Sequence, residues 1–123
     1  MRVLLLTDTH GQIDRINQLA AEYNADACIH CGDVGFFDCF SIKNMPVIEL
    51  TKIIRHTSLS AEEKEYLCSL PQTAQSDFVL QNALAGNFED YLTGSKKFSI
   101  PLYAVWGNHE DLRIINHLRE KPL

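Results

Sequence analysis

The sequence predicts an α/β fold that begins with parallel strands. Three short apolar runs, over residues 2–7, 27–30 and 100–106, have the length and composition of strands. Apolar residues at helical spacing follow the first run, and the joints on either side of them are short. A strand, a helix and a strand joined in this way form a βαβ unit, whose two strands are parallel.

The first half of the chain supplies this unit. Residues 2–7, "RVLLLT", form a continuous apolar run, as expected of a strand buried on both faces. Gly11 interrupts the run, and the helix that follows is expected to end at Asn24. Residues 27–30 predict a second buried strand, in which His30 is a core histidine at the strand end.

The middle of the chain, from about 43 to 97, predicts a helical insertion. Residues 46–56 show helical apolar spacing, with Pro46 in the first turn. Ser60 and Glu63 form a capping-box pattern that opens the next helix, which Pro71 ends. Residues 76–92 predict one further helix. After the insertion, residues 100–106 predict the third strand, and residues 110–120 predict an amphipathic terminal helix.

Composition limits the classes of function. At 123 residues the chain has room for one domain. Its net charge of −5, with scattered basic residues, does not indicate nucleic-acid binding. No apolar run approaches the roughly 20 residues of a membrane span. Four cysteines without secretory features predict free thiols and a cytoplasmic protein. Nothing in the sequence indicates the oligomeric state.

Polar side chains follow each predicted strand. Asp8 and His10 follow the first, Asp33 follows the second, and Asn108 and His109 follow the third. The carboxyl ends of parallel strands meet at one edge of a sheet, so we expect these residues to converge there. Carboxylate, imidazole and amide donors suit Mn²⁺, Fe or Zn²⁺. A carboxylate can also bridge two ions about 3.5–4 Å apart, as in two-metal hydrolases.

Each of these pairs also has a purely structural interpretation. Asp8 and His10 could be a helix-capping acid and a turn histidine, and Gly32-Asp33 is a common turn pair. Asn108 could cap the last helix. Two features favour the metal interpretation. Asp8 and His10 are two positions apart, so in an extended segment their side chains point to the same side. In addition, all three clusters occur at strand ends.

The segments "DTH", "GD" and "GNHE" resemble, in this order, the first three signature motifs of the calcineurin-like metallophosphoesterases. The resemblance implies a β-sandwich flanked by helices, of which this chain supplies the N-terminal half. It implies that Asp8 and His10 bind one metal, that Asp33 bridges two, and that Asn108 binds the second. His109 would face the scissile phosphate, as leaving-group acid or charge stabiliser. The implied reaction is hydrolysis of a phosphate mono- or diester by a metal-bound hydroxide.

Residues 88–111 also resemble the segment before the same motif in RNA lariat debranching enzymes, which carry a cysteine where this chain has Asp8. The chain departs from the wider family too. The lone histidine and the Gly-His-x-His motif found downstream in that family have no match, since His117 is the only histidine after "GNHE". We therefore expect weak metal retention and little turnover from this chain by itself. The chain is then part of a longer enzyme, an inactive, phosphoesterase-like binding module, or a chain completed by a partner or by self-association.

Overall fold

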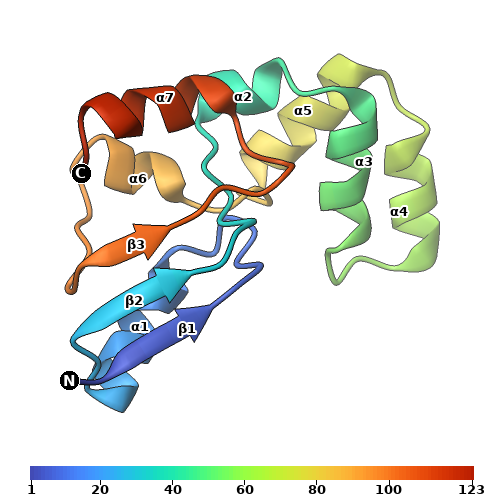
Figure 1. Ribbon diagram of the computed structural model, residues 1–123. Coiled ribbons are helices and arrows are strands. Elements are labelled where there is room, and N and C mark those ends of the chain that lie inside the picture. The colour runs from blue at the N-terminus through green and yellow to red at the C-terminus, as the bar shows by residue number, and fades with distance from the viewer. The chain divides into compact units, whose positions relative to one another are not determined.

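The computed structural model describes residues 1–123 (Figure 1). The chain forms two compact units. The sheet unit consists of Met1–Phe37 and Gly86–Leu123, and the helical unit consists of Asp38–Ala85. All the residues that the sequence assigns to the metal site lie in the sheet unit.

The sheet unit contains a parallel sheet of three strands, which confirms the predicted α/β class. Its strands are β1 (Val3–Leu6), β2 (Ala27–His30) and β3 (Leu102–Ala104), with β2 in the centre. β1 pairs with β2 and β2 pairs with β3, both in parallel. All three strands therefore point the same way (Figure 1), so the loops that follow them leave from one edge of the sheet.

Helix α1 (Asp14–Tyr23) connects β1 to β2, as the spacing of apolar residues predicts. Its buried side chains are Ile16 and Ala20, which lie one turn apart on one face of the helix. Asn24 ends the helix, as the sequence predicted, and its backbone is left-handed, with φ 49°. Its N–H donates to the carbonyl oxygens of Ala20 and Ala21, which closes the last turn.

Only one face of the sheet is covered. Leu4 and Leu102 flank Cys28 in register, and all three pack into the hydrophobic core. On the opposite face, Leu5 is 70% exposed and Tyr103 is 64% exposed. The prediction that residues 2–7 form a strand buried on both faces is therefore wrong. The core helices pack against a single face, so alternate side chains of β1 remain in contact with solvent.

The core of the sheet unit is completed by α6 (Phe88–Leu92) and α7 (Leu112–Glu120). Phe88 packs edge-to-face against Phe36, with ring centroids 4.8 Å apart. Tyr91 stacks on Phe98 at 4.6 Å. Helix α7 is capped by Asp111, whose carboxylate accepts the N–H of Arg113. Asp111 rather than Asn108 is therefore the N-cap, so the capping interpretation of Asn108 is wrong.

The helical unit contains α2 (Cys39–Lys43), α3 (Val47–Arg55), α4 (Ala61–Cys68) and α5 (Gln72–Gln81). The predicted capping box of α4 is confirmed, because the Ser60 hydroxyl accepts the N–H of Glu63 and the Glu63 carboxylate accepts that of Ser60, both at 3.2 Å. Helix α2 was not predicted, although Asp38 and Ser41 form a second capping box. That residues 43–97 form an insertion stays a prediction. The helical unit spans Asp38–Ala85, and α6 belongs to the sheet unit.

The prediction of one continuous helix over 76–92 is wrong. Helix α5 ends at Gln81 and α6 begins at Phe88. Between them the backbone turns through left-handed conformations at Ala83, with φ 50°, and at Gly86, with φ 88°. A helix cannot continue through such residues.

Two further features bear on the predictions from composition. All four cysteines are free thiols. No helix of the structure is both long enough and apolar enough to cross a membrane.

Candidate metal centre

The loops that follow β1 and β2 are joined by backbone hydrogen bonds. The N–H of Asp8 donates to the Gly32 carbonyl, and the N–H of His10 donates to the Asp33 carbonyl, both at 3.1 Å. Farther along, Gly11 donates to Val34 at 2.7 Å. Two segments that the sequence assigns to the metal site are therefore brought side by side.

The three candidate ligands on these loops have an unusual backbone conformation. Asp8, His10 and Asp33 have φ angles of 57°, 46° and 52°. The segment through Asp8 and His10 is thus not extended, so the argument from strand alternation is wrong. Left-handed conformations at residues other than glycine are costly and are concentrated at functional sites.

The Asp8 and His10 side chains nevertheless lie close together. His10 Nε2 is 3.6 Å from Asp8 Oδ1, and the two side chains are 60% and 52% exposed. An imidazole and a carboxylate at this separation can reach a common ion from the solvent side. The turn in the backbone, rather than strand alternation, makes them neighbours.

Asp33 carries a buried oxygen that lacks a hydrogen-bond partner. Its Oδ1 atom is inaccessible to solvent and forms no hydrogen bond. It lies against the backbone of Gly107, where a Cβ atom would overlap it. A carboxylate oxygen that is buried without a partner is unfavourable, because it has lost water and gained nothing in return. A cation would satisfy it.

The loop after β3 is held to the loop after β2 by Glu110. Its carboxylate accepts three backbone N–H groups, those of Val34 at 2.7 Å, Gly35 at 3.3 Å and Phe36 at 2.8 Å. Asn108 and His109 are exposed and lie between Gly107 and Glu110 in the chain. The segment that carries them is therefore fixed beside Asp33 at both of its ends.

The His30 ring forms hydrogen bonds with both loops, the one after β1 and the one after β2. It is fully buried, as the sequence predicted. Its Nδ1 accepts the N–H of Gly32 at 3.2 Å, so the neutral ring carries its proton on Nε2, which lies 2.9 Å from the Thr9 hydroxyl. The hydroxyl in turn donates to the Val34 carbonyl. Burial lowers the pKa of His30, and the charges of Asp8 and Asp33 oppose this shift only in part.

Gly11 is the point at which three segments meet. A Cβ atom at either Gly35 or Gly86 would overlap the Gly11 backbone. Both residues also have positive φ, at 89° and 88°. The Gly11 carbonyl accepts the N–H of Asn87, which brings the start of α6 to the same place. Glycine is required at these positions by both space and conformation.

The donors present fit a divalent cation in kind. Asp8, His10 and Asp33 offer oxygen and imidazole nitrogen, and the partnerless Asp33 oxygen is a position that a cation would satisfy. The structure nevertheless contains no group of three or more histidine, cysteine, aspartate or glutamate side chains arranged to hold a metal ion. The loops are joined, but their side chains are not closed around a common point.

The sequence alone did not reveal the roles of Glu110 and His30. Glu110 is the last residue of "GNHE", and its place next to the candidate ligands was the only available signal. His30 was predicted to be a core residue, but nothing local indicated that its ring joins two loops. Both roles depend on backbone groups that are distant along the chain.

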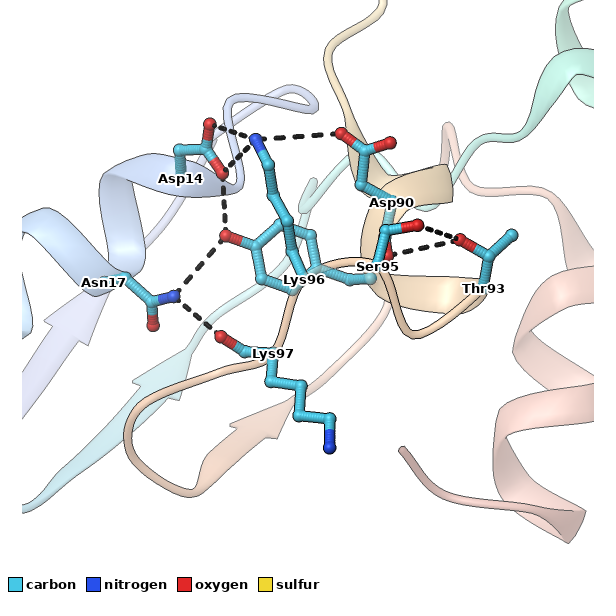
Figure 2. Close-up of polar contacts among 8 residues, drawn as sticks. Asp14, Asn17, Asp90, Thr93, Ser95, Lys96 and Lys97 are labelled. Atoms are coloured by element: carbon cyan, nitrogen blue, oxygen red, sulfur yellow. Dashed lines mark hydrogen bonds and ion pairs between the residues drawn. The ribbon is translucent and has the colours of Figure 1, made fainter.

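A second polar cluster lies where α1 meets the segment after α6 (Figure 2). Asp14 accepts hydrogen bonds from Lys96 at 2.9 Å and from the Tyr91 hydroxyl at 2.7 Å. Lys96 and then Tyr91 lower the pKa of Asp14 to about 2. Burial, followed by Asp14, raises the pKa of Tyr91 to about 12. The cluster contains none of the candidate ligands and anchors the segment that leads into β3.

Comparison with known proteins gives one match. The family model described as calcineurin-like phosphoesterase matches residues 1–122. No curated protein and no solved structure matches the chain. The weaker likeness to lariat debranching enzymes is unsupported by these comparisons. Because the family model covers all but one of the 123 residues, the chain belongs to the calcineurin-like phosphoesterase family.

Proposed function

We propose that this protein is a metal-dependent phosphoesterase that hydrolyses a phosphate mono- or diester at a dinuclear centre. One observation carries the proposal: the loops after β1 and β3 are both joined to the loop after β2, which carries a buried Asp33 oxygen without a hydrogen-bond partner. Membership of the phosphoesterase family supports it.

In this proposal Asp8 and His10 hold one ion, Asp33 contacts both, and Asn108 holds the second. Mn²⁺, Fe and Zn²⁺ are the candidates. When bound, such ions offset the charge of the phosphate and supply the nucleophile. The protein contributes the spacing of the ligands, because the loops are held together by their own hydrogen bonds.

His109 is proposed to act on the substrate. It is exposed and lies in the segment whose ends are fixed against the Asp33 loop by Gly107 and Glu110. An imidazole in this place can donate a proton to the leaving oxygen or stabilise its negative charge. Asn108, the neighbouring residue and a proposed ligand, would keep the ring close to the two metal ions.

The test is Mn²⁺-dependent hydrolysis of p-nitrophenyl phosphate and of bis(p-nitrophenyl) phosphate by the purified full-length protein. Asp33→Asn is expected to lower any Mn²⁺-dependent rate by about 100-fold or more, since it removes a charge at the reacting centre. Asp77→Asn is the matched control, because Asp77 is an exposed aspartate of α5 in the helical unit. Equal rates in the wild type and Asp33→Asn would refute the proposal.

A non-catalytic binding module is the second candidate. The observation that favours it is that no group of three or more histidine, cysteine, aspartate or glutamate side chains is already arranged to hold a metal ion. On this alternative the wild type would hydrolyse neither ester but would still bind inorganic phosphate or an ester analogue in calorimetry. Mn²⁺-dependent turnover by the wild type excludes it.

A further inference from the structure

We infer that Glu110 is a positioning residue, which sets the distance between the candidate ligands after β2 and those after β3. The inference rests on the proposed function, because it concerns the spacing of the proposed metal ligands. Glu110 is not itself among those ligands: its carboxylate is directed to the backbone of the Asp33 loop.

The contacts of Glu110 differ from those of an ordinary surface carboxylate. Both of its oxygens are used, Oε1 by Val34 and Gly35 and Oε2 by Phe36. Three successive N–H groups that converge on one anion form a backbone nest. Gly35 makes the nest possible, since its φ of 89° turns the chain so that the N–H groups face the same way. Hydrogen bonds to a charged acceptor are stronger than neutral ones.

The nest begins immediately after Asp33. Glu110 lies only three positions after Gly107, whose backbone touches Asp33 Oδ1. The two loops are thus joined at two points, and Asn108 and His109 lie between these points in the chain. Glu110 and Val34 are 76 positions apart in sequence, so this contact, rather than chain connectivity, holds the loops together.

A carboxylate is required for this role. In Glu110→Gln the side-chain NH₂ group would face at least one of the three N–H donors, so an acceptor is lost and a buried donor is left unpaired. Glu110→Asp keeps the charge but is one methylene shorter, so it can reach only part of the nest. Loss of metal affinity should therefore be larger in Glu110→Gln than in Glu110→Asp.

The experiment measures two quantities in the wild type, Glu110→Gln and Glu110→Asp. The first is the Mn²⁺ dissociation constant, from calorimetry. Residues that orient metal ligands typically contribute about 10- to 100-fold in affinity, and we expect a weakening of this size in Glu110→Gln. The second is amide hydrogen exchange, which needs no metal. Exchange at Val34 and Phe36 should accelerate in Glu110→Gln, whereas Gly11, which donates to the Val34 carbonyl, should stay protected.

Two controls separate positioning from general loss of stability. Glu22→Gln changes an exposed glutamate of α1 and should leave both quantities unchanged. Ser60→Ala removes a helix cap in the helical unit, so it should lower stability but leave Mn²⁺ affinity unchanged. If Glu110→Gln does not fold, Glu110→Asp carries the test: it should still bind Mn²⁺ more weakly than the wild type and show faster amide exchange at Val34 or Phe36, and wild-type values of both quantities would contradict the inference.

The outcomes distinguish this inference from the proposed function. If the wild type binds Mn²⁺, Asp33→Asn does not, and neither Glu110 variant loses affinity, the inference is wrong and the proposed function stands. If the wild type and Asp33→Asn bind Mn²⁺ equally or not at all, the proposed metal site fails, and the positioning role fails with it. Weakened binding together with faster exchange at Val34 and Phe36 supports both.

Discussion

At the scale of single residues, the space for the Asp33 carboxylate is created by the missing side chain of Gly107. The backbone of Gly107 is not left-handed, so its conformation alone would tolerate alanine. The restriction is steric, because a Cβ atom would overlap Asp33 Oδ1. Gly94 shows the opposite case, since its φ is 84° and nothing lies within 4 Å of the Cβ position.

Gly107→Ala is therefore expected to displace the Asp33 carboxylate. If Asp33 is the bridging ligand, the Mn²⁺ affinity should fall by about 10- to 100-fold, as for other changes that misorient a metal ligand. Calorimetric titration with Mn²⁺ measures this. Gly94→Ala is the control, since it strains the backbone but leaves Asp33 untouched. A Gly107→Ala variant with wild-type affinity would show that the Asp33 oxygen is not a ligand.

Asp14 makes stability depend on pH at the acidic end of the range. Its pKa is lowered from 3.8 to about 2, chiefly by Lys96 and then by Tyr91. Between these two values the unfolded chain binds more protons than the folded one, so stability falls as the pH falls. The contribution of Asp14 is fully present above about pH 4 and is lost as the pH approaches 2.

The measurement is the midpoint of urea unfolding for the wild type and Asp14→Asn between pH 7 and pH 2. The wild type should be the more stable at pH 7, and the difference should shrink between pH 4 and pH 2. Other carboxylates titrate in the same range, but their effect cancels in the difference between the two proteins. A difference that stays constant with pH would contradict the role of the Asp14 cluster.

At the scale of secondary-structure elements, the break between α5 and α6 follows from the packing of Gly86 on Gly11. The local sequence over 76–92 favours a single helix, but the structure needs a turn there that brings the start of α6 to the loop after β1. Asn87 then donates to the Gly11 carbonyl at 3.0 Å. Tertiary contact has overridden local helix propensity.

Gly86→Ala tests this explanation. A left-handed residue with a side chain costs about 1–2 kcal/mol in backbone strain. Gly94→Ala should show this cost alone, because the space around it is empty. In Gly86→Ala the free energy of unfolding should fall by clearly more, since the added Cβ would also overlap the Gly11 backbone. The free energy of urea unfolding measures both, and equal losses in the two variants would show that the Gly11 contact is unimportant.

At the scale of the whole molecule, metal binding should be coupled to folding. The proposed ligands come from three loops that adjoin only in the folded chain, so an ion would bind the folded state preferentially. At a metal concentration about 100 times the dissociation constant, such binding adds about 2.7 kcal/mol to the free energy of unfolding.

Mn²⁺ is accordingly expected to raise the midpoint of thermal unfolding of the wild type by several degrees, and a chelator should reverse the change. Circular dichroism followed during heating gives the measurement. Asp33→Asn should lose the increase, whereas Asp77→Asn should keep it. The same increase in Asp33→Asn as in the wild type would mean that Mn²⁺ binds elsewhere.

Much of this architecture could be read from local sequence. The apolar runs of the βαβ start, the end of α1 at Asn24 and the capping box of Ser60 and Glu63 are each visible within a short stretch of sequence. The candidate ligands could also be named, because each follows a recognisable apolar run. Structural features that depend on residues close together in the sequence are those that sequence patterns predict well.

By itself, the sequence determined the α/β class, the parallel sheet and which polar residues stand at the strand ends. The tertiary structure alone decided the left-handed backbone at Asp8 and Asp33, the exposed face of the sheet, the turn at Gly86 and the hold of Glu110 on the Asp33 loop. The physical reason is that these features arise from contacts between segments far apart in the chain. The favourable free energy of such contacts is gained only once the segments are packed together.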